Sequence, residues 1–168
     1  MELAVFDLDY TVWDPEMYQI SGPPIMSPIE DHPQKHTFNP TFLRSCSTIE
    51  EGKIVTDRRG TPMQVFDGAS HALTEINRMK KEGYGILAAV ASRTDEPSWA
   101  FKCMDWLTVH DGSTLSSCFD HVEISFADKE QHFRSLHKQT GIPYERMCFF
   151  DNEEWNIRNV VPLGVKCI

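Results

Sequence analysis

Apolar residues gather in short runs along the chain, and polar side chains follow directly where the runs end. The three clearest runs cover residues 3–6, 85–91 and 146–150. Runs of this length are typical of strands that are buried on both faces, as in a parallel sheet. Weaker strand patterns lie at 121–124 and 164–168.

Helical patterns lie between these runs. Residues 67–83 carry apolar side chains at helical spacing and end in Gly83, and glycine commonly terminates helices. Further helices are expected over 97–107 and 129–140, with a short one at 155–160. Strands that alternate with helices in this way predict an α/β fold built on a parallel sheet.

Two segments depart from this alternation. Residues 14–47 hold six of the ten prolines with little periodicity, and such long loops are usually functional or disordered. Because this segment follows an acidic pair, a lid over a site and a disordered insertion both remain open. Residues 52–66 have the pattern of a β-hairpin flap, with strands at 53–56 and 61–66 around a polar turn.

Length, charge and cysteine usage narrow the class of protein. A chain of 168 residues suits a single domain spanning residues 1–168. The net charge of −9 argues against nucleic acid as a partner but does not exclude local phosphate binding. The five cysteines are scattered and form no CxxC pair, which predicts a cytoplasmic protein. No apolar run is long enough to predict a membrane segment. The oligomeric state is open, with a monomer as the expectation.

The polar residues at the run ends form one set of candidate site residues. Asp7 and Asp9 follow the first run, Ser92 and Arg93 the second, Asp151 and Asn152 the run at 146–150, and Lys129 opens the helix before that last run. In a parallel sheet the carboxyl ends of the strands lie at one edge, where open α/β sheets bind their ligands. We therefore expect these side chains to converge.

Part of this set has the chemistry of a metal site. Asp7, Asp9 and Asp151, with the neutral side-chain oxygen of Asn152, are hard oxygen donors of the kind that suits Mg²⁺. A bound ion would offset the repulsion between these carboxylates and an incoming phosphate group.

The remaining residues suit phosphate chemistry. Ser92 can offer a hydroxyl and a backbone amide to phosphate oxygens, and Lys129 can offer a positive charge. Arg93 could bind the same phosphate or pair with a neighbouring carboxylate. Asp7 would attack phosphorus, while Asp9 would protonate the leaving oxygen and later activate water.

This order of motifs resembles the haloacid dehalogenase superfamily of phosphohydrolases, and within it the small eukaryotic magnesium-dependent phosphatases. The resembling stretches are Val5-Phe6-Asp7-Leu8-Asp9-Tyr10-Thr11-Val12-Trp13, Ala91-Ser92-Arg93-Thr94, Lys129 and Phe149-Phe150-Asp151-Asn152-Glu153, together with Asp57-Arg58-Arg59-Gly60, His132-Phe133 and Thr140-Gly141. The resemblance covers most of the chain except the Pro-rich segment 14–47.

The resemblance implies a Rossmann-like fold with a small β-hairpin flap and no large cap domain. It implies a magnesium-dependent phosphatase that forms an aspartyl-phosphate on Asp7 and uses Asp9 as general acid and base. Mg²⁺ would be held by Asp7, Asp151 and the backbone carbonyl of Asp9. The substrate would be phosphotyrosine, in a peptide or protein, or a small phosphosugar.

One position departs from the family pattern and keeps other interpretations open. The family usually has an aspartate where this chain has Asn152, so Mg²⁺ should bind more weakly, or Asn152 should act only through water. A catalytically silent relative that binds phosphoproteins is therefore one alternative. A receiver-type signalling module is another, but its phosphoacceptor would end a middle strand, and the second run here ends in Ser92.

Overall fold

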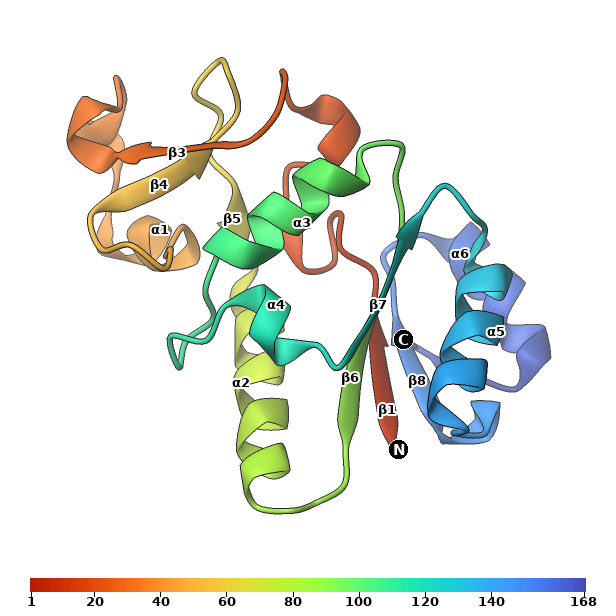
Figure 1. The fold of residues 1–168 in the computed structure, drawn as a ribbon. Coiled ribbons are helices and arrows are strands. Elements are labelled where there is room, and N and C mark those ends of the chain that lie inside the picture. The colour runs from red at the N-terminus through yellow and green to blue at the C-terminus, as the bar shows by residue number, and fades with distance from the viewer.

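A five-stranded parallel sheet forms the centre of the computed structural model, which describes residues 1–168 (Figure 1). The strand order is β7-β6-β1-β8-β9, with β1 (Leu3–Phe6), β6 (Leu87–Arg93), β7 (His121–Ser125), β8 (Met147–Phe150) and β9 (Lys166–Cys167). Every neighbouring pair is parallel. The predicted α/β fold is confirmed, and the run at 3–6 forms the middle strand.

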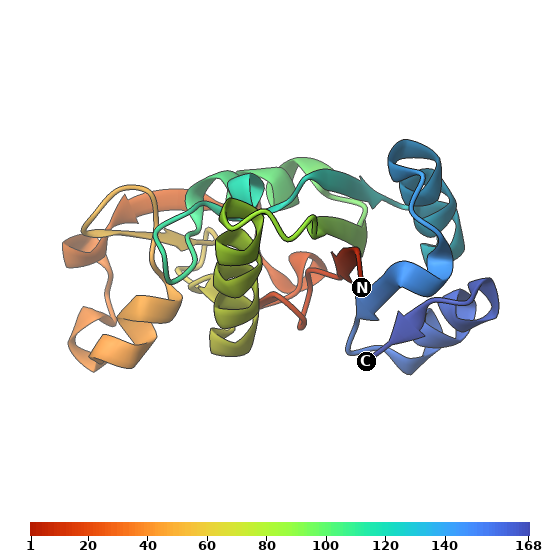
Figure 2. The ribbon, with the colours of Figure 1, turned by 90° about the horizontal axis from the view of Figure 1, so that it is seen from below.

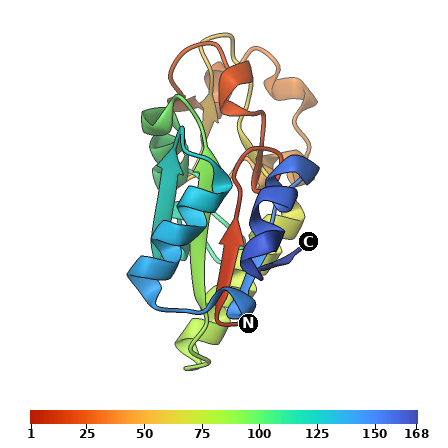
Figure 3. The same cartoon turned by 90° about the vertical axis from the view of Figure 1, so that its right-hand side faces the viewer.

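Helices cover both faces of this sheet. On one face lie α2 (Asp67–Lys81), α3 (Pro97–Trp106) and α4 (Leu115–Cys118), and on the other lie α5 (Lys129–Thr140) and α6 (Glu154–Val160). The 3₁₀ turns η4 (Tyr144–Arg146) and η5 (Val161–Leu163) precede β8 and β9. Figure 2 shows the two layers from below, and Figure 3 shows α5 and α6 in front of the strands. None of the helices has the length and apolar character needed to cross a membrane.

Alternate residues of β1 contribute to two separate cores. Ala4 and Phe6 belong to the larger cluster of 24 buried residues beneath α2, α3 and α4. Leu3 and Val5 belong to a cluster of 10 beneath α5 and α6. Because side chains alternate along a strand, a strand covered on both faces must be apolar at every position. This double burial explains the uninterrupted run that opens the sequence.

The Pro-rich segment contains short elements of its own. They are the 3₁₀ turns η1 (Met17–Gln19), η2 (Ile29–Asp31) and η3 (Lys35–Thr37), strand β3 (Ile25–Pro28) and helix α1 (Pro40–Ser45). Met17 and Ile20 are buried in the larger core. The segment is therefore built into the fold at its beginning, and its role as a lid stays a prediction.

The two strands expected in the flap each pair with a further strand as well. β4 (Lys53–Thr56) pairs with β3, and β5 (Gln64–Val65) pairs with β2 (Trp13–Asp14), both in antiparallel fashion. The two sides of the expected hairpin meet at one isolated bridge, between Thr56 and Pro62. Two backbone hydrogen bonds flank this bridge, from the Asp57 amide to the Thr61 carbonyl (3.0 Å) and from the Met63 amide to the Val55 carbonyl (2.9 Å). Pro62 occupies the non-hydrogen-bonded position between them, where its missing N–H is tolerated. The small hairpin flap is therefore present, and each of its strands also pairs with a strand of the Pro-rich segment or its start.

The polar turn after β4 is organised by Asp57. Its buried carboxylate accepts hydrogen bonds from the backbone amides of Ser21 (2.7 Å), Thr61 (2.8 Å) and Arg59 (2.9 Å). Burial acts to raise the pKa of Asp57, but these hydrogen bonds outweigh it, and the pKa lies below its usual value. The Asp57 side chain therefore ties the turn to Ser21 in the Pro-rich segment.

Candidate active site

The carboxyl edge of the sheet carries a buried cluster of opposite charges. Lys129 is 1% exposed, and its ammonium lies 2.5 Å from Asp7 Oδ1 and 3.4 Å from Asp151 Oδ2. The ammonium also donates a 2.5 Å hydrogen bond to the Ala91 carbonyl in β6. Asp7 follows β1, Asp151 follows β8 and Lys129 begins α5, so elements far apart in sequence meet at this point.

Local structure at the start of α5 places Lys129 in the cluster. Asp128 is the N-cap residue, and its carboxylate accepts a 2.8 Å hydrogen bond from the Gln131 amide. The helix therefore begins at Lys129, whose side chain lies in the interior. A buried ammonium is costly unless carboxylates and hydrogen-bond acceptors surround it, and Lys129 has both.

Asp7 is held by one oxygen and left free at the other. Its Oδ1 contacts Lys129, while its Oδ2 accepts no hydrogen bond within the protein. Burial raises the pKa of Asp7 to about 7, although Lys129 acts in the opposite direction. A second cation beside Asp7 would offset this cost of burial and favour the ionised carboxylate.

Asp9 makes its hydrogen bonds to residues outside that cluster. Its carboxylate accepts hydrogen bonds from the Trp13 indole (2.8 Å) and from the Met17 amide (3.0 Å), so both oxygens are engaged. A tight turn brings Trp13 back to Asp9: Tyr10 has a φ of +53°, which is uncommon for a bulky residue. Burial raises the pKa of Asp9 above its usual value, which favours the protonated form that a general acid needs.

Asp151 is positioned by a residue that sequence reasoning missed. Its Oδ1 accepts a 2.8 Å hydrogen bond from the Glu153 amide, and its Oδ2 accepts one of 2.9 Å from the Asn156 side chain. Asn156 is buried, and its own Oδ1 has no partner. The available signal was its place four residues before Val160, on the buried face of a short helix.

Asn152 does not join the buried cluster. Asn152 is exposed. Its backbone amide donates a hydrogen bond to Thr11 Oγ1 (3.2 Å), and its side-chain Oδ1 lies 3.3 Å from the same hydroxyl. Thr11 belongs to the turn after Asp9, so Asn152 ties the end of β8 to that turn. The predicted role of Asn152 as a direct metal ligand is thus left without support from its position.

Ser92 and Arg93 end β6 next to Asp7, in different environments. Ser92 is 2% exposed, and its hydroxyl makes no hydrogen bond within the protein. The guanidinium of Arg93 lies over the rings of Phe126 (4.5 Å to the centroid) and Trp155 (5.9 Å). Arg93 forms no ion pair, so the expected alternative of a salt bridge to a neighbouring carboxylate is wrong. Cation–π contacts hold it instead and leave its N–H donors free.

A cavity of about 310 Å³ opens over this edge of the sheet. Its lining comprises Asp7, Asp9, Glu16, Tyr18, Arg93, Lys129, Asn152, Glu153, Trp155 and Asn156. Two lining acids, Glu16 and Glu153, lie near each other, and burial together with the charges of Asp9 and Glu153 raises the pKa of Glu16. Of the predicted residues, Ser92 and Asp151 do not reach the wall of the cavity.

The donor set fits a magnesium ion bound by few protein ligands. No three acidic, histidine or cysteine side chains converge closely enough to hold a metal ion by themselves. Asp7 and Asp151 nevertheless share a single buried ammonium, and the backbone carbonyl of Asp9 accepts no hydrogen bond within the protein. Two carboxylates and a free carbonyl suit Mg²⁺, which usually keeps several waters and shares ligands with substrate phosphate.

Comparisons with known proteins identify the family of the chain. The model of the acid phosphatase family matches residues 1–168. Human magnesium-dependent phosphatase 1 is 34% identical over 167 residues, which are 99% of this chain and 76% of that protein. A HAD-like hydrolase superfamily protein of Schizosaccharomyces pombe is 32% identical over 165 residues, covering 96% of this chain and 81% of that protein.

A solved structure gives the same fold. A haloacid dehalogenase family enzyme of Bacteroides thetaiotaomicron, in complex with magnesium and inorganic phosphate, aligns with a TM-score of 0.54. The alignment covers 100% of this chain and 93% of that chain at 15% identity, so it speaks for the fold alone. Taken with the family match, the chain belongs to the acid phosphatase family, as a magnesium-dependent phosphatase of the haloacid dehalogenase superfamily.

Proposed function

We propose that the protein hydrolyses phosphate monoesters through an aspartyl-phosphate on Asp7. The observation that carries this proposal is the asymmetry of Asp7: Lys129 fixes Oδ1, while Oδ2 is free in a residue that lines the cavity. Oδ2 attacks phosphorus, the bond from phosphorus to the ester oxygen breaks, and that oxygen leaves with a proton. Water then attacks the same phosphorus, which releases inorganic phosphate and restores the carboxylate.

Asp9 is the proposed source and acceptor of the proton. Its raised pKa suits the protonated form for the first step, and the ionised form that results can take a proton from water in the second. Trp13 and Met17 each occupy one lone pair of the Asp9 carboxylate, so each oxygen keeps a second lone pair for a proton. Trp13 and Met17 therefore act as positioning residues that hold Asp9 in place.

Several groups of this chain can bind the phosphate. Lys129 supplies charge, Ser92 a free hydroxyl and Arg93 a guanidinium held by aromatic rings. The backbone amides of Leu8 and Asp9 also donate to no acceptor within the protein. Asp7, Asp151 and the Asp9 carbonyl would hold Mg²⁺, which when bound withdraws negative charge from the phosphate. Free hydrogen-bond donors at one strand end suit a phosphate group whose negative charge must be stabilised in the transition state.

The rim of the cavity supports phosphotyrosine as the substrate, with phosphosugars as the second class. Tyr18 is 74% exposed, Phe126 67% and Trp155 46%, and Tyr18 and Trp155 line the cavity itself. Rings left in water at the mouth of a site can pack against an aromatic group of the ligand. A small sugar would use the polar rim and leave these rings exposed.

The test of this function is a steady-state assay with an aryl phosphate. We expect turnover with Mg²⁺, loss of turnover when a chelator removes the metal, and recovery when Mg²⁺ is added back. A phosphotyrosine peptide should have a higher kcat/KM than a hexose phosphate. No turnover of any of these substrates would favour the phosphoprotein-binding relative instead.

Replacing Asn152 by aspartate should lower the Mg²⁺ concentration that the enzyme requires. The added charge lies at the end of β8 beside Asp151, so we expect the Mg²⁺ concentration at half-maximal rate to fall by about tenfold. The measurement is a Mg²⁺ titration of the initial rate. Asn159→Asp, an exposed change on α6, is the control and should leave the titration unchanged. An Asn152→Asp enzyme with the metal dependence of the wild type would contradict the prediction.

The cysteines bear on the compartment in which the protein works. All five cysteines are free, and four of them are buried. Unpaired buried thiols support a reducing compartment, and we propose that the protein works in the cytoplasm.

A further inference from the structure

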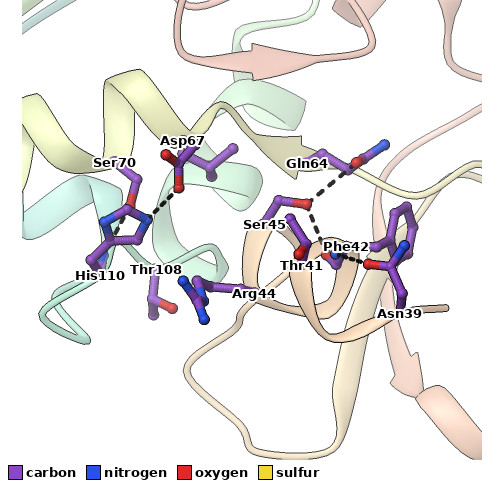
Figure 4. Close-up of a pocket in the computed structure, with 11 residues that line it drawn as sticks. Asn39, Thr41, Phe42, Arg44, Ser45, Gln64, Asp67, Ser70, Thr108 and His110 are labelled. Atoms are coloured by element: carbon purple, nitrogen blue, oxygen red, sulfur yellow. Dashed lines mark hydrogen bonds and ion pairs between the residues drawn. The ribbon is translucent and has the colours of Figure 1, made fainter.

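A second cavity lies apart from the candidate active site. It has a volume of about 290 Å³ and lies between α1, β5, the first turn of α2 and the segment 108–110 (Figure 4). The two cavities share no lining residue. Only Phe42 and Val65 among its eleven lining residues are hydrophobic, so a polar ligand would match its walls.

Arg44 supplies an unmatched positive charge to this cavity. Its side chain extends from α1 toward Thr108 and His110 in Figure 4. The guanidinium forms neither an ion pair nor a hydrogen bond within the protein, and the residue is exposed. Five free N–H donors in a planar array suit a carboxylate or a phosphate, because either anion can accept two of them at once.

Thr108 supplies a hydroxyl without a partner. The residue is only 7% exposed, and its backbone amide donates to the Ser47 carbonyl (3.0 Å), but its hydroxyl makes no hydrogen bond within the protein. The hydroxyl is therefore free to donate and to accept one hydrogen bond or more at the wall of the cavity. Thr108 lines the cavity beside Arg44, so a ligand there would complete its hydrogen bonding.

The one acid in the lining contacts His110 and not Arg44. Asp67 Oδ1 lies 3.1 Å from His110 Nε2, and the His110 amide donates a 2.9 Å hydrogen bond to Ser70 Oγ. Figure 4 shows this pair on the side of the cavity away from α1. Asp67 therefore does not pair with Arg44, whose charge stays available to a ligand.

Hydroxyl and amide groups make up the opposite wall. Ser45 Oγ donates to the Phe42 carbonyl (2.8 Å) and lies 3.3 Å from Gln64 Oε1. The Gln64 side-chain nitrogen and the Thr41 hydroxyl make no hydrogen bond within the protein, and both residues line the cavity. Such groups match the hydroxyls of a polyol. Cavities of about 300 Å³ are at the lower end of those that hold small molecules, so the ligand should be small.

We propose that this cavity binds a small hydroxylated oxyanion, with its anionic group on Arg44 and Thr108 and its hydroxyls on Gln64 and Thr41. The anionic group is a carboxylate or a phosphate ester, which share this recognition chemistry. The site is separate from the one that performs hydrolysis and does not depend on the proposed function.

The test is a titration of the full-length protein, without added metal, followed by the backbone amide signals in NMR. The probes are gluconate, glycerol 2-phosphate and, as the neutral match, glycerol. We expect saturable shifts at Thr108, His110 and Gly112 with one or both anions, and binding of glycerol at least about tenfold weaker. Which anion binds more tightly identifies the source of the anionic group.

Two variants separate this site from the active site. Arg44→Gln and Thr108→Val should each weaken binding by about tenfold while leaving aryl phosphate turnover unchanged. Arg134→Gln, which removes the same charge from an exposed position on α5, should leave binding unchanged. Shifts confined to Leu8, Asp9 and Asn152, or shifts that survive Arg44→Gln, would overturn the proposal without touching the proposed hydrolysis.

Discussion

Asp7→Asn should lower the kcat/KM of phosphomonoester hydrolysis by about 10⁴-fold or more. Asparagine has nearly the same shape and can still accept a hydrogen bond from Lys129, so the fold should persist. It has no anionic oxygen to form a bond with phosphorus, so the covalent step is lost. The measurement is the initial rate with an aryl phosphate at saturating Mg²⁺, with unfolding monitored in parallel.

The control and the intermediate make this result specific to Asp7. Asp31→Asn changes an exposed carboxylate in the Pro-rich segment and should keep full activity. Acid quenching of the wild-type reaction followed by mass spectrometry should detect a phosphorylated peptide that contains Asp7, absent from the Asp7→Asn protein. Retention of more than a tenth of the activity by Asp7→Asn would rule out its role as nucleophile.

Lys129→Met should destabilise the protein by about 3–5 kcal/mol, in addition to abolishing turnover. Methionine has a similar length and can pack against the ring of Phe149, which now lies 5.5 Å from the ammonium. The loss comes from charge, because Asp7 and Asp151 would remain buried with no cation between them. Urea unfolding without metal measures the effect.

Three comparisons isolate the charge effect at Lys129. Lys138→Met, an exposed change on the same helix, should alter stability by less than about 0.5 kcal/mol. Adding Asp7→Asn to Lys129→Met should recover part of the loss, since one buried charge is removed. Mg²⁺ should stabilise Lys129→Met as well. Equal destabilisation by Lys138→Met, or no recovery in the double variant, would assign the loss to packing.

The sheet and the meeting of Asp7, Lys129 and Asp151 could be predicted from the sequence. The apolar runs identify buried strands, and a parallel sheet places all their carboxyl ends at one edge. Polar residues at those ends therefore had to lie near one another. This inference needed only the period and the length of each run.

The finer arrangement of the site could not be predicted in this way. The hydrogen bond from Trp13 to Asp9 depends on the left-handed backbone conformation of Tyr10. Tyrosine rarely adopts this conformation, so the sequence does not indicate it. The rings over Arg93 come from Phe126, just after β7, and from Trp155 in α6, which only the tertiary fold brings together. The pairing of β4 with β3 also could not be predicted, because β3 lies in the Pro-rich segment, whose sequence shows little periodicity.

The position of β1 has a consequence for how the protein is made. β1 is synthesised first, yet its neighbours in the sheet are β6, reached at Leu87, and β8, reached at Met147. On the ribosome, this apolar strand must wait with both edges unpaired until nearly all of the chain described here has emerged. Such a strand is a natural target for chaperones and a risk for aggregation while it waits. Because Asp151 directly follows β8, no shorter nascent chain can hold the assembled site, and phosphatase activity cannot precede the synthesis of β8.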